Sequence, residues 1–555
     1  MSQRERYAPA AGLAAIYVLM IVAVNPLGDF PLNDDWAYAD TVKLLLERHQ
    51  LRISSWGAPS VLTQALFGAL FCLPFGFSYT ALRLASATLG LVAVLATFWL
   101  ARRAGAGRGL AFVCGLTLAV NPLLFQCAHT FMTDTPFVAW LLLAIGCFVA
   151  SAGGSRALVA AAVVMPLVAT LTRQLGLVLP LAFALGCVLG RTVTRRSLAV
   201  LGAGALLATL GLRLFEHWLR ASGQMTSTFG LQTRQVMALL GSTAELRRSW
   251  PFMLTRLRHA FVFSGLFLLP ALIAILPRRL RARRRDLAIA AALAITFAAT
   301  TVADFTRRRI PLPFNGHYNL VDFGLGPTTL TDVYVRGLRQ LPQLDAGLWW
   351  LLTWIGVAGG SALVFLLALT GLQLCRRHDD GGAQTTAATA WAFAGGYLVI
   401  LSAVTIVDRY FIPLFPLLLV AGVWNGRAPG IPPWLCRTIH GIAIAAAALL
   451  CWFSVAATHD YLAWNRARWQ ALYQLTDLEH VPPTQIDGGF EFNGSRLFGG
   501  RRNVPGKAWW WVEDDLYMVT LGPMPGYHTL RTYPYWRWLP PGRGRHDVVV
   551  LVRDP

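Results

Sequence analysis

The sequence predicts an all-α polytopic membrane protein of about 13 transmembrane helices, with a small C-terminal α+β domain outside the membrane. Two observations on composition favour this class. Of the 555 residues, 55% are hydrophobic and only 14% are charged, whereas soluble proteins carry about 25% charged residues. A third observation is that apolar runs recur from residue 11 to residue 456. Many of them approach the roughly 18 residues that cross a bilayer as a helix.

The net charge of +21 lies largely in short loops between the apolar runs. Lys and Arg in such loops mark the cytoplasmic side of a membrane protein, so this charge indicates topology and not a nucleic-acid partner. The 8 cysteines lie in or at the ends of apolar segments. Because they form neither a disulfide framework nor a zinc-type spacing, we interpret them as packing residues and identify no metal ligands among them.

The N-terminal segment predicts one span followed by a long outer loop. Arg4 and Arg6 precede an apolar run over 11–25, which places the N-terminus inside and residues 26–79 outside. No clear cleavage site follows the run, so we expect an uncleaved anchor. Within the first outer loop, residues 40–49 have separate apolar and charged faces and are too few to span. We expect an interfacial helix lying on the membrane.

The next apolar segment, 61–77, is interrupted by Pro74 and Gly76. Residues 80–100 form a better span and end in the basic loop 101–108, which should lie inside. On this charge argument 61–77 does not cross fully and is interfacial or re-entrant, although a complete span stays open as the alternative.

The later basic loops fix the direction of the other spans, and the strongest inside marker is the arginine-rich loop 278–285. Two long outer loops are expected over 217–258 and 303–347. The remaining predicted spans are 109–126, 135–151, 157–171, 175–190, 198–215, 259–276, 286–302, 348–374, 387–406, 411–424 and 437–456.

The C-terminal part differs from the rest of the chain. Residues 457–555 are polar, rich in Trp, Pro and Gly, and end in a plausible buried strand over 547–553. We predict a transmembrane module over 1–456 and a small C-terminal domain over 457–555. The charge pattern leads us to expect a multi-pass protein of a bacterial cell inner membrane, with this domain and the functional site facing the periplasm.

The stretch 33–40, Asn-Asp-Asp-Trp-Ala-Tyr-Ala-Asp, places three carboxylates beside the membrane surface. One interpretation is structural, because Asn33 or Asp34 could simply cap a surface helix. The other is a reaction centre that includes Asp34 and Asp35. Ionisable groups at membrane depth are costly, so they suggest function by default.

Other polar residues collect on the same predicted side, and each has a structural alternative. Asp134 could cap the span that begins just after it. Arg173 could extend to the interface as a span end, and Arg409 could anchor one. Arg307 and Arg308 could bind anionic lipid head groups.

Carboxylates and arginines on one apolar-walled face suit sugar transfer from a polyprenyl-phosphate donor. Arginines bind the phosphate and stabilise it as a leaving group, and a carboxylate takes the proton of the attacking hydroxyl. The expected reaction inverts the sugar carbon, and no Walker-type sequence is present for ATP. The alternatives are a transporter or flippase of lipid-linked sugars, for which mid-membrane charges or inverted repeats are not seen, and a non-catalytic envelope assembly protein.

Several motifs of this chain resemble those of one family. They are Asp34-Asp35-x-x-Tyr38-Ala39-Asp40, Phe75-Gly76-Phe77 with Ala81-Leu82-Arg83-Leu84, Thr133-Asp134-x-Pro136-Phe137, Thr172-Arg173 and Arg409-Tyr410-x-x-Pro413. Together they are similar to the C-type membrane glycosyltransferases, which include the lipid A aminoarabinose transferases and the protein O-mannosyltransferases. The resemblance covers roughly residues 10–190, and 400–425 more weakly.

The resemblance implies a C-type glycosyltransferase architecture and a polyprenyl-phosphate-linked sugar as donor. It also implies Asp34 as the principal catalytic carboxylate, Asp134 as its partner and Arg173 near the donor phosphate. Asp35 completes the predicted catalytic set. The predicted substrate-binding residues are Tyr38, Arg83, Arg173, Arg307, Arg308 and Arg409.

The acceptor is left open as a lipid, a glycan or a protein, and membrane lipids are further expected partners. The chain departs from the family at Gly57-Ala58-Pro59, where the aminoarabinose transferases carry a Glu-Lys pair before the proline. The glutamate of that pair is implicated in metal binding. This departure argues against a bound metal and against a phosphate contact from that position. A divalent cation stays possible as a cofactor, without a clear ligand set.

Overall fold

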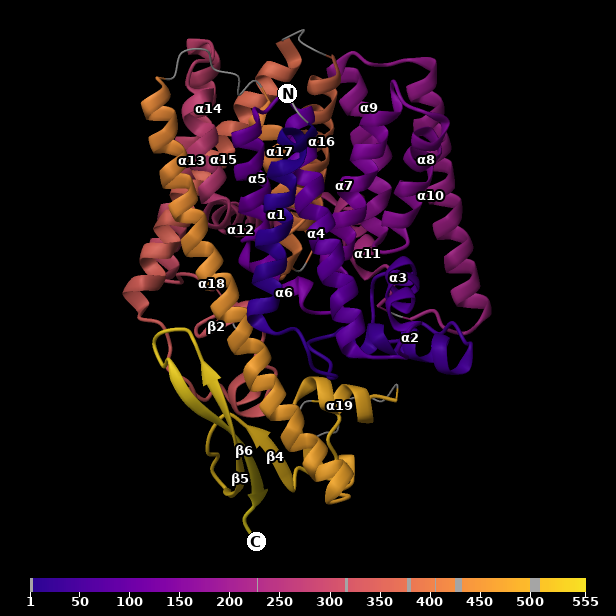
Figure 1. Cartoon of the computed structure of the whole chain (residues 1–555), viewed down its shortest axis with the longest axis vertical. Coiled ribbons are helices and arrows are strands. Elements are labelled where there is room, and N and C mark those ends of the chain that lie inside the picture. The colour runs from indigo at the N-terminus through magenta and orange to yellow at the C-terminus, as the bar shows by residue number, and fades with distance from the viewer. Residues whose placement is uncertain are drawn as a thin grey trace.

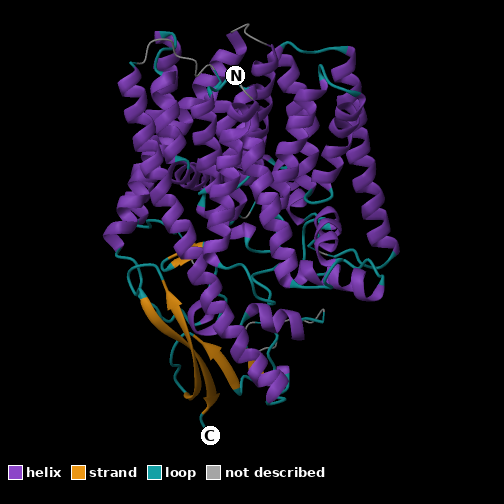
Figure 2. Ribbon diagram, viewed as in Figure 1, coloured by secondary structure: helices purple, strands orange, loops and turns teal. Residues whose placement is uncertain are grey.

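The computed structural model describes residues 3–226, 228–314, 318–376, 381–404, 406–424, 432–499 and 510–555. Long helices run side by side through most of the molecule, and a small sheet lies beyond one end of them (Figures 1 and 2). The N-terminus lies at the opposite end of the bundle from this sheet (Figure 1). The arrangement confirms the predicted all-α polytopic fold with a small C-terminal α+β region.

The helical part extends from Gln3 to Tyr473. Its first half consists of α1 (Gln3–Val24), α2 (Asp35–Arg48), α3 (Leu62–Cys72), α4 (Tyr79–Arg103), α5 (Arg108–Ala119), α6 (Pro122–Ala128), α7 (Asp134–Ser151), α8 (Arg156–Thr170), η1 (Gln174–Leu177), α9 (Val178–Gly190) and α10 (Arg195–Ala221). Its second half consists of α11 (Leu231–Gly241), α12 (Thr243–Phe267), α13 (Leu269–Arg279), α14 (Arg284–Arg308), α15 (Ala346–Arg376), α16 (Gly381–Ala403), η3 (Asp408–Phe411), α17 (Leu414–Val423) and α18 (Pro433–Tyr473).

Within the described residues, 8 helices are long and apolar enough to cross a membrane. Two more spans arise if the bent pairs α5–α6 and α12–α13 each count as one, with bends of 58° and 91°. The helices α8 and η1–α9 are apolar but shorter. Every predicted span coincides with one of these helices or with α17, so the predicted order of apolar helices is confirmed.

The bend between α5 and α6 has a local cause in the sequence. Asn121 accepts a hydrogen bond from the backbone N–H of Leu124 at 3.1 Å, and Pro122 occupies the first position of the new helix. A side-chain cap followed by proline starts a helix without continuing the previous one. The predicted span 109–126 is therefore two helices, and the second directs the chain toward Asp134.

The first loop carries two short helices at the end of the bundle that faces the sheet (Figure 1). The expected interfacial helix 40–49 begins earlier than predicted, because α2 starts at Asp35. An acidic residue in the first turn favours a helix start. The helix α3 has 11 residues, and at 1.5 Å per residue it reaches about 16 Å. This is about half of a bilayer core, so the helix is too short to cross.

The C-terminal region is a four-stranded sheet with one helix beside it. Its elements are β3 (Ile486–Asp487), α19 (Phe490–Leu497), β4 (Tyr517–Thr520), β5 (Tyr527–Arg537) and β6 (Gly544–Arg553). The strand order is β3-β4-β6-β5, with β3 parallel to β4 and the other neighbours antiparallel. The predicted strand over 547–553 is the C-terminal part of β6.

Short elements connect the bundle to this sheet. They are β1 (Leu320–Val321), β2 (Gly324–Leu325), η2 (Thr331–Val335), η4 (Gln474–Leu478) and η5 (Pro483–Gln485). The helix α18 runs from the bundle to the sheet without a break at residue 456. Buried residues of the sheet such as Val519 and Val548 belong to the same hydrophobic cluster as bundle residues such as Phe263. The division into domains at residue 456 stays a prediction.

Candidate active site

The side chain of Asp34 points away from the helix that it precedes. Asp34 is the N-terminal flanking residue of α2, but its carboxylate makes no capping hydrogen bond. Its Oδ1 accepts a hydrogen bond from the indole N–H of Trp56 at 2.9 Å, and its Oδ2 lies 3.0 Å from Nη2 of Arg409. This geometry therefore does not support a purely capping role for Asp34.

Asp134 is the first residue of α7 and is fully buried. The residue at the N-cap of α7 is Thr133, so Asp134 is not the cap that the sequence allowed, and no side-chain capping hydrogen bond forms there. Oδ1 of Asp134 lies 2.8 Å from Nη2 of Arg173, whose Nε donates to Oγ1 of Thr133 at 2.7 Å. The span ends of α7 and α8 thus meet through an ion pair between two residues that the sequence analysis selected separately.

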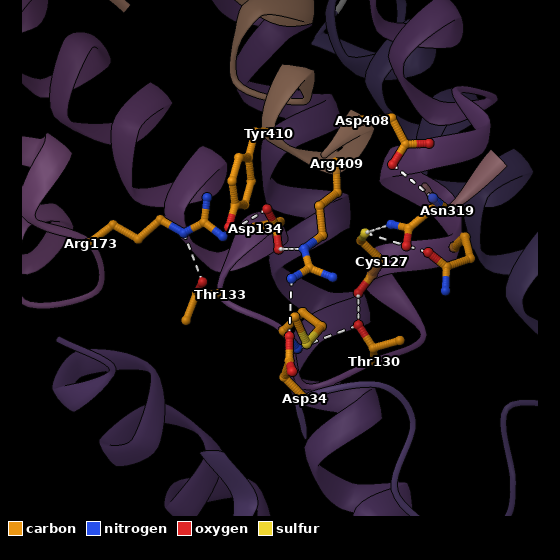
Figure 3. A network of polar contacts seen from close by, with 12 residues as sticks. Asp34, Cys127, Thr130, Thr133, Asp134, Arg173, Asn319, Asp408, Arg409 and Tyr410 are labelled. Carbon is orange, nitrogen blue, oxygen red and sulfur yellow. Dashed lines mark hydrogen bonds and ion pairs between the residues drawn. The ribbon is translucent and has the colours of Figure 1, made fainter. Parts of the chain in front are cut away.

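Arg409 joins the two acids. Its Nη2 contacts Asp34, and its Nε lies 3.7 Å from Oδ2 of Asp134. In Figure 3 the chain of contacts runs from Arg173 through Asp134 and Arg409 to Asp34. We call these four residues the site network. The predicted residues Asp34, Asp134, Arg173 and Arg409 therefore lie together.

The loop that carries Arg409 is held by its neighbours. The carboxylate of Asp408 accepts the backbone N–H groups of Asn319 and Leu320, both at 2.8 Å. The ring of Tyr410 stands between the two arginines of the site network (Figure 3), with its centroid 5.4 Å from one guanidinium and 5.7 Å from the other. An aromatic face at this distance stabilises a cation. Tyr410 thus helps to keep two like charges close together.

Two buried polar atoms of the site network have no hydrogen-bond partner among the residues that the structure describes. Oδ2 of Asp134 and Nε of Arg409 are buried and make no hydrogen bond within the described part of the chain. The side chain of Asp34 is 18% exposed and that of Asp134 is 0% exposed. Buried polar atoms are usually hydrogen-bonded, and exceptions often mark functional positions. Asp34 is the carboxylate that a hydroxyl substrate could reach.

Tyr38 lies beside the site network on the first turns of α2. It is buried, and its ring packs so closely on Gly57 that a Cβ there would lie 3.0 Å from Cε1 of Tyr38. Burial, and after it the charge of Asp34, raise the pKa of the Tyr38 hydroxyl. The phenol therefore stays neutral and is able to donate a hydrogen bond.

Asp35 and Arg83 are buried away from the site network, where they bind backbone groups. The two oxygens of Asp35 accept the backbone N–H groups of Leu32 at 2.5 Å and Phe131 at 3.2 Å. Burial raises the pKa of the Asp35 carboxyl well above its usual value. The guanidinium of Arg83 donates to backbone carbonyls over 26–30 and to that of His129.

This geometry gives Asp35 and Arg83 the role of holding the first loop against the 129–131 turn. It presents neither side chain to a substrate. Their predicted catalytic and substrate-binding roles gain no support from these contacts, so we leave both residues out of the proposed reacting set.

Arg307 and Arg308 lie in the last turn of α14 and contact Asp304 of the same helix. Arg307 is 80% exposed. No hydrogen bond or ion pair of the described structure joins either arginine to the site network. Of the eight arginines and carboxylates predicted for the site, four form the site network. The other four, Asp35, Arg83, Arg307 and Arg308, lie outside it.

No ligand set for a metal ion emerges from the predicted residues. Within the ranges that the structure describes, no three His, Cys, Asp or Glu side chains lie close enough together to hold one. The turn at Gly57-Ala58-Pro59 supplies no carboxylate. The described residues therefore offer no metal site built from three protein ligands, and the reaction proposed below has no step through a metal ion.

Sequence reasoning missed two residues that act on Asp34 or its backbone. One is Trp56, and the other is Glu491, whose Oε1 accepts the backbone N–H of Asn33 at 2.8 Å. A signal for Trp56 is its place in a polar break of the first loop. No local signal exists for Glu491, which is 458 residues from Asn33.

A family model described as dolichyl-phosphate-mannose-protein mannosyltransferase matches residues 64–241. The match extends from α3 to α11 and confirms the resemblance to the C-type membrane glycosyltransferases in that segment. No curated protein matches the chain in sequence.

Several solved structures are similar to this chain. ArnT from Cupriavidus metallidurans bound to undecaprenyl phosphate is 12% identical with a TM-score of 0.49, and the match covers 99% of this chain and 98% of that chain. The S. cerevisiae protein O-mannosyltransferase complex bound to the sugar donor is 17% identical with a TM-score of 0.33, covering 40% and 34%. The archaeal oligosaccharyltransferase AglB from Archaeoglobus fulgidus, in complex with an inhibitory peptide and a dolichol-phosphate, is 12% identical with a TM-score of 0.44, covering 88% and 59%. The matches span less than two thirds of the yeast and archaeal chains.

Proposed function

We propose that this chain, which resembles the C-type membrane glycosyltransferases, transfers a sugar from a polyprenyl-phosphate donor to the hydroxyl of a lipid, glycan or protein acceptor. The observation that carries the proposal is the position of Arg409 between Asp34 and Asp134. A partly exposed carboxylate stands directly beside a cluster of two arginines. These are the two chemical elements that transfer from a sugar phosphate needs.

In the proposed reaction Asp34 is the general base. It takes the proton of the acceptor hydroxyl while the hydroxyl oxygen attacks the sugar carbon that carries the phosphate. The bond from that carbon to the phosphate oxygen breaks, and its electron pair stays on the polyprenyl phosphate. Because attack and departure occur on opposite faces, the sugar carbon inverts.

Arg173 and Arg409 bind the donor phosphate and stabilise the charge that develops on it. A guanidinium matches phosphate oxygens with parallel N–H donors and stays charged at any relevant pH. Fixed donors aimed at developing charge supply much of the rate enhancement in such sites. The buried carboxylate of Asp134 orients both guanidiniums, and its own burial keeps it away from the acceptor.

Orientation in the membrane is also part of the proposal. The N-terminus and the C-terminal sheet lie at opposite ends of the bundle (Figure 1). This supports the expected topology, with the N-terminus inside and the sheet on the periplasmic side of a bacterial inner membrane. The acceptor would then meet the lipid-linked donor on the outer face.

The test is Asp34→Asn, measured as sugar transfer from a polyprenyl-phosphate donor in membranes. Removal of a general base lowers rates by about 10²–10⁴-fold, and we expect about a thousandfold loss. The matched control is Glu47→Gln, an exposed carboxylate on the same helix α2, which should change the rate less than twofold. Normal transfer by Asp34→Asn at normal protein level would refute the proposal.

A further inference from the structure

The carboxylate of Asp34 is held at both oxygens by side chains from different parts of the chain. Arg409 contacts Oδ2 at 3.0 Å, and the indole N–H of Trp56 donates to Oδ1 at 2.9 Å. One oxygen therefore faces the cationic side of the site network. The other faces a neutral donor from the first loop.

The turn that carries Trp56 is itself fixed. The backbone N–H of Gly57 donates to the carbonyl of Ser54 at 3.3 Å, which closes the turn. A Cβ at Gly57 would lie 3.0 Å from the ring of Tyr38, so the turn rests directly on α2. The backbone of Trp56 is thus set against the helix that follows Asp34.

The indole ring of Trp56 is held by aromatic neighbours on its other sides. Ring centroids lie 6.1 Å from Trp36, 5.5 Å from Phe490, 5.6 Å from Phe498 and 5.4 Å from Trp511. Most of these contacts are edge-to-face or tilted, which is the preferred arrangement of aromatic pairs. Three of the four neighbours come from the C-terminal region. The direction of the indole N–H is therefore set by packing and not by the hydrogen bond alone.

We propose that Trp56 is a positioning residue for Asp34, and that its packing against Phe490, Phe498 and Trp511 fixes the plane of the reacting carboxylate through it. This inference rests on the proposed function of Asp34. A carboxylate with one donor on each oxygen cannot rotate freely, and its remaining lone pairs keep one direction. A general base needs such fixed geometry because small misplacements are costly in rate.

Trp36 provides a matched control within the same cluster. Its ring is also buried among Phe490, Phe498 and Trp511. Its indole nitrogen, however, has no hydrogen-bond partner in the described ranges. Trp36→Phe and Trp56→Phe therefore remove similar rings, and only Trp56→Phe removes a donor from Asp34.

The experiment compares both variants in full-length protein in membranes, with sugar transfer measured from pH 4 to pH 9. We expect Trp56→Phe to lower the transfer rate about tenfold. The low-pH limb of its rate profile should move to higher pH by about one unit, because a hydrogen bond to the charged form of a carboxylate favours that form. Trp36→Phe should change the transfer rate less than twofold and should move the low-pH limb by no more than a few tenths of a pH unit.

If both variants lose rate equally and neither limb moves, Trp56 only packs and the inference is overturned. If Trp56→Phe fails to fold, benzothienylalanine at position 56, introduced by codon suppression, keeps the ring size and replaces the N–H by sulfur. The same rate loss and pH shift are then expected, and wild-type behaviour overturns the inference. The proposed function fails separately, through an active Asp34→Asn variant.

Discussion

Two arginine–carboxylate networks lie in different parts of the molecule, and they differ in how completely their carboxylate oxygens are paired. The first is the site network. The second joins the C-terminal region to the loops beside the bundle, and we call it the joint. In the joint, Oε2 of Glu491 accepts from Nη1 of Arg468 at 2.8 Å and from Oγ1 of Thr329 at 2.6 Å, and its Oε1 accepts from the backbone of Asn33.

The two networks also differ in exposure. Glu491 and Arg468 are 1% and 0% exposed, and every oxygen of that carboxylate has a donor. In the site network Asp34 is partly exposed, and Oδ2 of Asp134 has only a long ion-pair contact to Arg409. A buried carboxylate with a donor on every oxygen is fixed in one arrangement, whereas an incompletely paired carboxylate keeps an acceptor available for a ligand. We infer that the joint orders the first loop and that the site network acts on substrate.

The largest expected effect comes from Arg409→Ala. Removing this guanidinium takes away the contact shared by Asp34 and Asp134 and one of the two proposed phosphate ligands. An arginine that stabilises phosphate charge in a transition state is worth about 10³–10⁵-fold in rate. We expect about a ten-thousandfold loss of sugar transfer, with a smaller loss in Arg409→Lys, which keeps the charge.

The matched control for this arginine is Arg307→Ala. Arg307 is exposed and contacts only Asp304 within the described residues. Exposed ion pairs contribute about 0–1 kcal/mol, so the rate of transfer should change less than twofold. Equal losses in the Arg307 and Arg409 variants would mean that the outward arginines also bind substrate, as the sequence analysis predicted.

A smaller effect, and on stability first, is expected from Glu491→Gln. The amide keeps an oxygen for the Asn33 N–H but leaves the Arg468 guanidinium buried without a counter-charge. Breaking one partner of a buried ion pair costs about 3–5 kcal/mol. We expect a loss of about 4 kcal/mol in unfolding free energy, seen as a lower melting temperature in detergent.

Glu479→Gln is the control for Glu491→Gln, because it removes the same charge from an ion pair that is not buried. Glu479 also pairs with an arginine of the C-terminal region, Arg531, but both side chains are partly exposed. Its melting temperature should stay within about a degree of wild type, since exposed pairs contribute little. If Glu491→Gln melts normally while transfer is lost, the joint contributes to catalysis and not mainly to folding.

Much of the fold could be predicted from the sequence because membrane helices follow simple physical rules. Apolar length and the placement of arginines gave each predicted span, and helices occupy all of them. Bends and short helices were less predictable. The break at Asn121 and Pro122 lies inside an unbroken apolar run, so hydropathy alone does not reveal it.

The residues of the candidate site could be predicted where a charged side chain lies at the end of a span. Asp34, Asp134, Arg173 and Arg409 were identified in this way, and they lie together. Only the family resemblance ranked Asp34 above Asp35. Charge and position alone could not separate them, because the difference lies in which way each side chain turns at the start of α2. Asp35 turns inward to backbone N–H groups.

Contacts over long sequence distances were out of reach for a similar reason. Trp56 acts on a residue 22 positions away, and Glu491 on one 458 positions away. Neither residue belongs to a charged span end, and neither forms a motif with its neighbours. Only packing in three dimensions aims an indole N–H at one carboxylate oxygen.

The smallest expected effect concerns Asp332, a carboxylate near the joint that forms no ion pair with an arginine of the described ranges. Its Oδ2 accepts the backbone N–H of Leu521 at 2.9 Å, and burial raises its pKa to about 6. Between about pH 4 and pH 6 the folded state holds a proton that the unfolded state has lost, so stability falls as pH rises through this window. The total fall in unfolding free energy is about 3 kcal/mol, and it should be complete above pH 6.

The variant Asp332→Asn tests this prediction. It keeps an oxygen for Leu521 and should remove the slope, so that the variant matches wild type near pH 4 and melts at a higher temperature at pH 7.5. Asp345→Asn, an exposed change in the same outer loop, should keep the wild-type slope. An unchanged slope in Asp332→Asn would instead mean that water reaches this part of the joint. The joint would then be partly accessible to solvent, as the site network is.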